Sequence, residues 1–430
     1  MPGWCRRWQG GLAGGRSCLV TLRKIGALTA QHLPPNDWAM GESKSMQEVE
    51  TSKPLPRFRV SEVWIFGATA LLARLTMFPF VSQDATVSLL PWMQEFRDRG
   101  AAALGGEFSN YNFPYMFLMF LGSLLPLEPL FAIKSISLVG DFLLALSVGA
   151  LAKQFRPAGL MPATASLIAL FLPTVLLNAS MWGQSDSFYT SFLLLSLRAL
   201  IRDESHSPWL WWAVALSFKL QATFFLPALV LISVRRRQRI SLTPPLLAAC
   251  VLAVLSIPPI LFGRSLTSTL SIYIQQTQDN GVGGAANIHA WFPTVAPAEI
   301  RVPAILACGA VLLFTAIAYW RGTDTAERRV VLAITVLAVC PLLLPQMHDR
   351  YFFAAEVMSL FLIKHKKLFV VPCLFAATGL AIYCLYFLNN KYIWPYMFAS
   401  IFQCLAVAIL LRTLWRGNDQ SLNDSFSVSR

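Results

Sequence analysis

The sequence predicts an all-helical membrane protein that crosses the bilayer many times. Apolar residues make up 56% of the 430 residues and charged residues only 13%, whereas soluble domains average about 45–50% and about 25%. Apolar runs close to the length of a bilayer span follow one another along most of the chain. Water could not accommodate so much apolar surface, but a bilayer allows the outside of a helical fold to be apolar as well.

Basic residues give the chain a net charge of +13, yet their placement does not indicate nucleic acid as a partner. They gather at the ends of apolar runs, most densely at 235–239 and 364–367. Basic clusters in such places are typical of cytoplasmic membrane flanks. The eight cysteines form no CxxC pair, so neither a zinc site nor a disulfide framework is predicted.

The chain divides into a membrane domain, residues 57–416, and two polar tails. Residues 1–56 are rich in Gly, Arg and Ser and hold no apolar run long enough for a signal peptide or a span. They form either a disordered cytoplasmic tail or an extension before a true start at Met40 or Met46. Residues 417–430 are interpreted as a polar cytoplasmic tail.

The first span of the membrane domain is predicted at Val60–Val81, because a span needs about 20 apolar residues. The polar stretch Ser82–Phe113 follows and is expected to form short helices on the membrane surface. A second polar stretch, Arg264–Ala298, separates two later runs. The remaining apolar runs bring the prediction to roughly 10–13 spans and are 114–129, 131–152, 160–178, 185–201, 209–234, 242–263, 301–320, 328–345, 351–363, 368–388 and 396–414.

Lys and Arg predict the orientation, since cytoplasmic loops carry an excess of both. Three strongly basic loops are placed in the cytoplasm, at 235–239, 321–329 and 364–367. The two long polar stretches and His348 then face outside. Between 114 and 234 two topologies stay open. Either every run spans once and Asp186 is cytoplasmic, or Asp186 faces out and Lys219 lies at the tip of a hairpin of two short helices. We favour the second topology, because Lys219 otherwise lies in mid-bilayer.

Polar groups at membrane depth are costly, about 2.5–3.5 kcal/mol for a central Lys or Arg, so polar clusters beside apolar runs are informative. Asp84 lies at the lip of the first predicted span, in the same polar stretch as Tyr111 and Asn112. A carboxylate at this position suits a general base, although a helix-capping Asp in a solvated loop also explains it.

Three further clusters interrupt the apolar runs. The segment 178–186 combines an Asn, Trp182, Gln184 and an Asp, which suits either a sugar-binding surface or a simple turn. Lys219 needs a partner or a path to water, so it binds a phosphate or extends to the interface. His348 and Arg350, two residues apart, could each contact a phosphate oxygen; an interfacial loop is the alternative. A metal site usually has more ligands nearby than this.

Taken together, these clusters resemble the GT-C superfamily of membrane glycosyltransferases, most closely the bacterial relatives of the phosphatidylinositol-glycan second mannosyltransferase. The resemblance covers about residues 60–363, most of the membrane domain. Its motifs run in order as SQDATVSLLPW with FSNYNFPY, NASMWGQSD, SFKLQATFFLP and LLPQMHDRYFFAAEVMSL. The last motif is the most specific of the four.

The resemblance implies roles for individual residues. In this family an acidic residue of the first external loop is the catalytic base, and Asp84 matches its position. Asp186 matches the second acidic motif, and His348 with Arg350 resembles the motif beside the donor phosphate. Many members carry two adjacent acidic residues in the first loop. Here Gln83 precedes a single acid, so a divalent metal is not supported by the sequence.

The implied function is transfer of a hexose, most simply mannose, from a polyprenyl or dolichyl phosphate to a glycan or glycolipid on the outer or lumenal face, with inversion. Asp84 would act as base, Arg350, His348 and Lys219 would bind the donor phosphate, and no nucleotide-binding Gly-rich loop is present. The rival prediction is a transporter or a flippase for lipid-linked glycans, because charges at membrane depth also mark transport paths. The membrane is expected to be a bacterial inner membrane, or the ER membrane in a eukaryote.

Overall fold

The structure is a computed structural model that describes residues 60–155, 160–237, 241–275, 285–390 and 392–417. The predicted N-terminal tail, with both alternative start positions, and residues 418–430 of the predicted C-terminal tail lie outside the described residues. By its contacts the chain separates into residues 1–54 and 55–430, and all described residues belong to the second unit.

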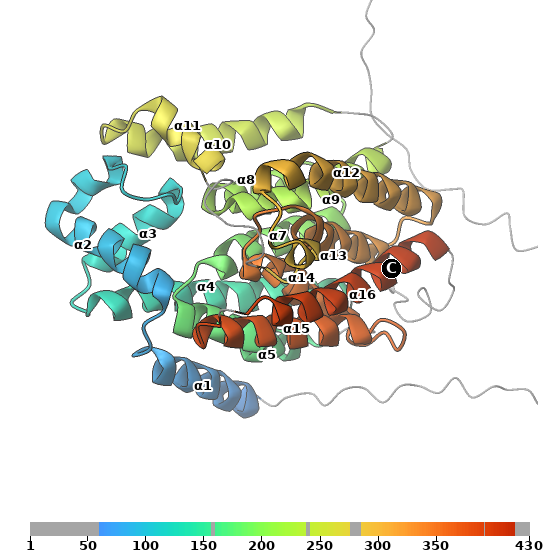
Figure 1. Ribbon diagram of the computed structural model, residues 1–430, viewed down its shortest axis with the longest axis horizontal. Coiled ribbons are helices and arrows are strands. Elements are labelled where there is room, and N and C mark those ends of the chain that lie inside the picture. The colour runs from blue at the N-terminus through green and yellow to red at the C-terminus, as the bar shows by residue number, and fades with distance from the viewer. Residues whose placement is uncertain (1–59, 156–159, 238–240, 276–284, 391, 418–430) are drawn as a thin grey trace, which may run out of the picture. The chain divides into compact units, whose positions relative to one another are not determined.

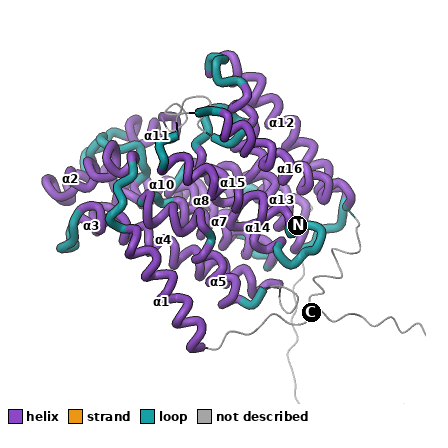
Figure 2. The backbone as a smooth tube through the Cα atoms, turned by 60° about the horizontal axis from the view of Figure 1, so that its bottom comes forward, coloured by secondary structure: helices purple, strands orange, loops and turns teal. Residues whose placement is uncertain are grey.

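Every regular element in the described part of the chain is helical, and no strand occurs there (Figures 1 and 2). The prediction of an all-helical protein is confirmed for these residues. The helices are α1 (Val60–Met77), α2 (Leu90–Arg99), α3 (Phe113–Ser123), α4 (Pro129–Ala152), α5 (Pro162–Phe171), α6 (Pro173–Leu177), α7 (Asp186–Ile201), α8 (Ser207–Phe218), α9 (Leu226–Arg237), α10 (Thr243–Leu261), α11 (Leu266–Gln275), α12 (Pro297–Arg321), α13 (Ala326–Leu343), α14 (Phe353–Ser359), α15 (Val370–Phe387) and α16 (Trp394–Arg416).

Five helices of the described chain are long and apolar enough to cross a membrane: α4, α10, α12, α15 and α16. A sixth span results if α5 and the segment Pro173–Trp182 count as one span bent by 58°. The bend falls at Leu172, whose extended backbone (ψ 126°) is typical of a residue that precedes proline. These helices support a membrane-spanning protein, with fewer full-length spans than the roughly 10–13 predicted from apolar runs.

Large apolar side chains cover the outward faces of these long helices. Leu146 on α4, Val254 on α10 and Leu306 on α12 are each more than 60% exposed. Apolar surface of this extent has no place in water, whereas lipid tails solvate it. By contrast, α7 and α13 are buried along most of their length and form the centre of the helix assembly, where α7 contacts α4 and α8.

A fully buried ion pair attaches α1 to this centre. The Nε atom of Arg74 lies 2.8 Å from Asp141 Oδ2 on α4, and Ser187 Oγ on α7 donates to Asp141 Oδ1 at 2.6 Å. The guanidinium also donates to the carbonyl of Leu170 on α5 at 2.9 Å. Four helices are therefore fixed to one another around a single carboxylate.

Lys134 on α4 fixes the segment that follows α1. Its buried ammonium donates to the carbonyl oxygens of Phe78, at 2.8 Å, of Met77, at 3.3 Å, and of Phe80. Met77 is the last residue of α1, and Phe78 and Phe80 come just after it, so the ammonium also lies at the helix end that favours a cation. The backbone that leads to Asp84 is thus held against α4.

Irregular backbone gathers where the conspicuous polar residues lie. Ala85–Leu89 and Asn178–Trp182 form single π-helical turns, which occur frequently at functional sites. Lys219 is extended and separates α8 from the short 3-10 turn Leu220–Phe225. Two short helices, α8 and α9, thus lie on either side of Lys219, while the predicted hairpin with Lys219 at its tip stays a prediction. The polar stretch Ser82–Phe113 is built of short helical segments, also as predicted.

Candidate active site

The carboxylate of Asp84 lies at the centre of a dense hydrogen-bond network. Its Oδ2 accepts from Trp182 Nε1 at 2.9 Å, from Gln184 Nε2 at 2.8 Å and from Arg350 Nη1 at 3.1 Å. Its Oδ1 accepts from the Tyr386 hydroxyl at 3.1 Å, and the same hydroxyl accepts from the Asp84 backbone N–H. Because both oxygens are engaged, this Asp is not a solvated helix cap.

Asp186 forms a second, deeper carboxylate site at the start of α7. It is fully buried, and its Oδ1 lies 2.6 Å from the ammonium of Lys219. Its Oδ2 accepts from Asn178 Nδ2 at 3.0 Å, and that amide also donates to the Tyr383 hydroxyl at 2.9 Å. Lys219 therefore has a counter-ion inside the fold and does not extend to an interface.

Arg350 connects the two carboxylates. Its Nη1 lies 3.1 Å from Asp84 Oδ2, and its Nε lies 3.5 Å from Asp186 Oδ2. The same Nη1 is 3.1 Å from His348 Nε2. The negative charges of Asp84 and Asp186 are thus balanced by the positive charges of Arg350 and Lys219. A buried charged network requires such a balance.

Aromatic rings form the wall of this site. Trp182 stacks on Tyr386 with ring centroids 3.8 Å apart and an interplanar angle of 16°, and the guanidinium carbon of Arg350 lies 5.1 Å from the Trp182 ring. The chain turns directly after Trp182 at Gly183, where φ is +78°. Only glycine adopts this conformation without steric cost, and the turn directs Trp182 and Gln184 toward the same carboxylate.

Asp84 is held ionised by its surroundings. Burial raises the pKa of this carboxyl, but the charges of Arg350 and His348 and the hydrogen bonds from Trp182 and Tyr386 outweigh it, so the pKa falls below the usual 3.8. Desolvation, the strongest influence on Tyr111, raises its pKa to about 12. Tyr111 therefore stays neutral and donates its hydroxyl hydrogen to Gln184 Oε1 at 2.9 Å.

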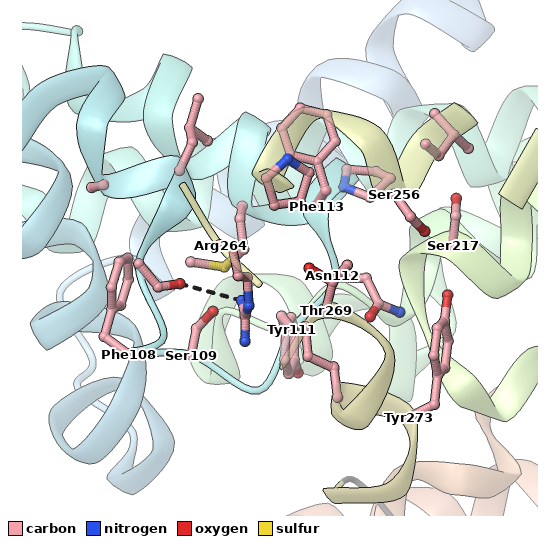
Figure 3. Close-up of a pocket in the computed structure, with 18 residues that line it drawn as sticks. Phe108, Ser109, Tyr111, Asn112, Phe113, Ser217, Ser256, Arg264, Thr269 and Tyr273 are labelled. Carbon is pink, nitrogen blue, oxygen red and sulfur yellow. Dashed lines mark hydrogen bonds between the residues drawn. The ribbon is translucent and has the colours of Figure 1, made fainter. Parts of the chain in front are cut away.

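The structure brings eight of the nine residues singled out from the sequence into this network. They are Asp84, Tyr111, Trp182, Gln184, Asp186, Lys219, His348 and Arg350. Asn112 has no hydrogen-bond partner for its Nδ2 among the described residues and lines a neighbouring cavity (Figure 3). Reasoning from the sequence included Asn178 in the polar segment 178–186 without giving it a role, and it missed Tyr383 and Tyr386. The two tyrosines lie three residues apart on α15, and this helical spacing places both on one face.

Within the described residues, no group of three or more His, Cys, Asp or Glu side chains is placed to hold a metal ion. Gln83, which stands where the resemblance would place a second acid, is exposed and lies outside the network. The candidate site is consequently made of carboxylates, basic groups, amides and aromatic rings. Such a set can accept a proton and can neutralise a phosphate.

No protein-family model matches the chain, and no curated protein matches it significantly.

Proposed function

We propose that this protein is a GT-C-type membrane glycosyltransferase. It moves a hexose, most simply mannose, from a polyprenyl or dolichyl phosphate to a hydroxyl of a glycan or glycolipid. The observation that carries the proposal is the position of Arg350 between Asp84 and Asp186, in a network assembled from residues up to 302 positions apart in sequence. A carboxylate, a guanidinium and an imidazole in mutual contact supply the proton acceptor and the cations that this reaction needs.

In the proposed reaction, Asp84 accepts the proton of the acceptor hydroxyl while the hydroxyl oxygen bonds to the anomeric carbon of the sugar. The bond between that carbon and the phosphate oxygen breaks, and its electron pair leaves with the lipid phosphate. A single in-line displacement of this kind inverts the anomeric centre. The reaction needs one base and one group that stabilises negative charge on the leaving phosphate.

Arg350 supplies that stabilisation only after an exchange of partners. In the structure its charge is balanced by Asp84 and Asp186, so a phosphate must compete with a carboxylate for the guanidinium. Exchange of the Asp84 contact for the donor phosphate would remove one cause of the low pKa of Asp84. The base would then be strongest when the donor is bound, with Lys219 keeping Asp186 neutralised.

The proposal also includes the side of the membrane on which the site and the loops lie. Asp84, Gln184 and Arg350 contact one another, so in the proposal they share one side of the membrane, the outer or lumenal face. The short helices of Ser82–Phe113 lie on the membrane surface in this arrangement, and the basic loops at 235–239 and 364–367 are cytoplasmic. The membrane is a bacterial inner membrane, or the ER membrane in a eukaryote.

One observation favours a second candidate, a transporter or flippase for lipid-linked glycans. The segment α5–α6 is bent by 58°, and discontinuous helices beside buried charges also build transport sites. The two candidates differ in product. A transferase forms a new glycosidic bond and releases lipid phosphate, whereas a flippase leaves the lipid-linked sugar intact and moves it between leaflets.

The test of the proposal uses purified protein in lipid nanodiscs, supplied with radiolabelled polyprenyl-phosphate mannose and a glycolipid extract of the source cells. Label that moves to a new lipid or glycan, with release of polyprenyl phosphate, supports the transferase. Failure of this transfer, together with scrambling of the same donor between the leaflets of proteoliposomes, would instead establish the flippase.

A further inference from the structure

A cluster of arginines lies where α12 and α16 end. The two helices pack against each other (Figure 2), and their ends meet at Gly322 and Gly417, where a Cβ added to Gly417 would approach the Gly322 Cα to 3.3 Å. Arg328, near the start of α13, is only 3% exposed. It donates to the carbonyl oxygen of Ala318 on α12, at 3.0 Å, and to that of Leu414 on α16, at 3.1 Å. One guanidinium thus joins the two helix ends.

Three further arginines complete this arginine cluster. Arg235 on α9 donates to two carbonyl oxygens at the end of α12. Arg321 and Arg416 are the last residues of α12 and α16, and both are exposed. The guanidinium carbon of Arg321 lies 4.5 Å from the centroid of the Trp415 ring. Helices that are distant in sequence therefore bring four guanidiniums to one end of the helix assembly.

The positive charge of the arginine cluster is not balanced within the part of the chain that the structure describes. None of its four members forms an ion pair there. Asp324, close by in sequence, is paired with Arg329 at 2.7 Å and accepts from the Tyr319 hydroxyl at 2.6 Å. The two helix C-termini together supply about one negative charge. Even with buried Glu327 counted as ionised, a surplus of about two positive charges remains.

An apolar strip leads from the arginine cluster along α12. Leu313, Ile317 and Arg321 follow one another at intervals of four residues, so they share one face of the helix. Leu313 is 63% exposed and Ile317 46%. Phe314 stacks on Trp415 of α16, with ring centroids 5.0 Å apart. Tryptophan and arginine at the end of an apolar helix are typical of the boundary between lipid tails and headgroups.

We infer that this surface binds an anionic phospholipid of the phosphatidylglycerol type. Arg321 and Arg416 contact its phosphate, and its acyl chains lie along Leu313 and Ile317. A guanidinium presents a fork of donors to phosphate oxygens, and basic pockets between membrane helices bind lipid headgroups in this way. A zwitterionic lipid carries its own cation and leaves the surplus charge in place, so the site selects lipids with a net negative charge. The inference is independent of the proposed sugar transfer, because none of these residues belongs to the Asp84 network.

The experiment titrates the full-length protein in detergent micelles with phosphatidylglycerol or with phosphatidylcholine of the same acyl chains, and native mass spectrometry measures the bound lipid. The first phosphatidylglycerol should bind at least about fivefold more tightly than phosphatidylcholine, since one basic side chain near an anionic lipid already supplies roughly that factor. Equal affinities would overturn the inference. Inorganic phosphate in excess, with ionic strength matched by chloride, should leave the lipid bound; its displacement by phosphate would show a site for free anions instead.

Variants assign the contacts. Arg321→Gln and Arg416→Gln should each weaken phosphatidylglycerol about tenfold and leave phosphatidylcholine unchanged, whereas Arg321→Lys should retain part of the preference. Arg202→Gln is the matched control, because Arg202 is exposed but its charge is already paired with Glu204 at 2.9 Å. An equal loss in Arg202→Gln would indicate general attraction to a basic surface and would refute a specific site.

Thermal unfolding gives a second readout that does not depend on mass spectrometry. Both arginines are exposed at helix ends, so the double variant Arg321→Gln with Arg416→Gln should unfold at the temperature of wild type when no lipid is added. Phosphatidylglycerol should raise the unfolding temperature of wild type, because a ligand of the native state stabilises it, but not that of the double variant. An equal rise in both proteins would remove the two arginines from the site.

Discussion

Replacing Asp84 with asparagine removes the proposed base and leaves its surroundings almost intact. Oδ2 accepts three hydrogen bonds, from Trp182, Gln184 and Arg350, and an amide oxygen can take over all three. The amide nitrogen then faces the Tyr386 hydroxyl, which can accept a hydrogen bond. The change is therefore confined to one charge and one proton-accepting position.

The expected loss follows from that chemistry. A positioned general base contributes typically about 10²- to 10⁴-fold, so kcat for sugar transfer should fall by this factor in Asp84→Asn. Donor binding should not weaken, because Arg350 loses a competing carboxylate and keeps Asp186 at 3.5 Å. A lower kcat with an equal or smaller donor KM indicates a missing base. In a damaged site, by contrast, kcat falls and the donor KM rises.

The assay measures transfer of radiolabelled mannose from polyprenyl phosphate by matched amounts of wild-type and variant protein, with monodispersity and thermal unfolding as folding checks. Asp98→Asn is the matched control, since Asp98 lies in the same polar stretch, is exposed and, within the described part of the chain, accepts a side-chain hydrogen bond only from Gln94, at 2.7 Å. Activity of the Asp84 variant above about a tenth of wild type would refute its role as base. An equal loss of transfer in Asp98→Asn would show that the effect arises from any change in the stretch Ser82–Phe113 and not from Asp84 itself.

Three further predictions concern the charges and the backbone around the site. Arg350→Gln removes the largest of the influences that lower the pKa of Asp84, so this pKa should rise. Since the base must be ionised, the acid limb of the kcat/KM profile should move to higher pH, and an unmoved limb would count against the coupling. Arg74→Ala leaves the buried carboxylate of Asp141, which lies 2.8 Å from Arg74 in the structure, without its counter-ion. It should lower the free energy of unfolding by about 3–5 kcal/mol, measured by thermal unfolding. Arg99→Ala is the control, because Arg99 forms an exposed ion pair with Glu95 at 3.3 Å; its loss should change the free energy of unfolding by about 0–1 kcal/mol. Equal losses in the two variants would contradict a structural role for Arg74. Gly183→Val forces a β-branched residue to φ +78°, on the order of 1–3 kcal/mol of strain, and should lower transfer more than Gly183→Asn, which tolerates that region; similar activities would argue against a strained turn.

Much of the candidate site could be predicted from the sequence because its charged members stand out against apolar runs. Asp84, Asp186, Lys219 and Arg350 are each costly at membrane depth, so their presence indicated a common purpose before any geometry was known. Their pairing was not predictable. Nothing in the order of the residues shows that Lys219 neutralises Asp186 while Arg350 lies between two carboxylates.

Other parts of the structure left little signal in the sequence. Tyr383 and Tyr386 lie within an apolar run, and tyrosine is common at membrane interfaces, so their contacts with the site did not stand out. Arg74 and Asp141 are charges in two separate apolar runs, which also hold Glu62 and Lys134. The cost of burying a charge predicts a partner for each, but not that Arg74 and Asp141 pair with each other. Apolar length also gave no sign of the bend within 160–178, which falls at Leu172, the residue before a proline.

The proposed function requires that a lipid-linked sugar phosphate binds at Arg350, and equilibrium binding of the donor tests this without any knowledge of the acceptor. Radiolabelled polyprenyl-phosphate mannose is titrated against wild type, Arg350→Lys and Arg350→Ala in nanodiscs by scintillation proximity, at matched amounts of folded protein. Wild type should bind saturably, Arg350→Ala about ten- to a hundredfold more weakly, and Arg350→Lys in between, because a guanidinium offers a fixed fork of donors and an ammonium a point charge. Donor curves that coincide for all three proteins would exclude this network as the phosphate site.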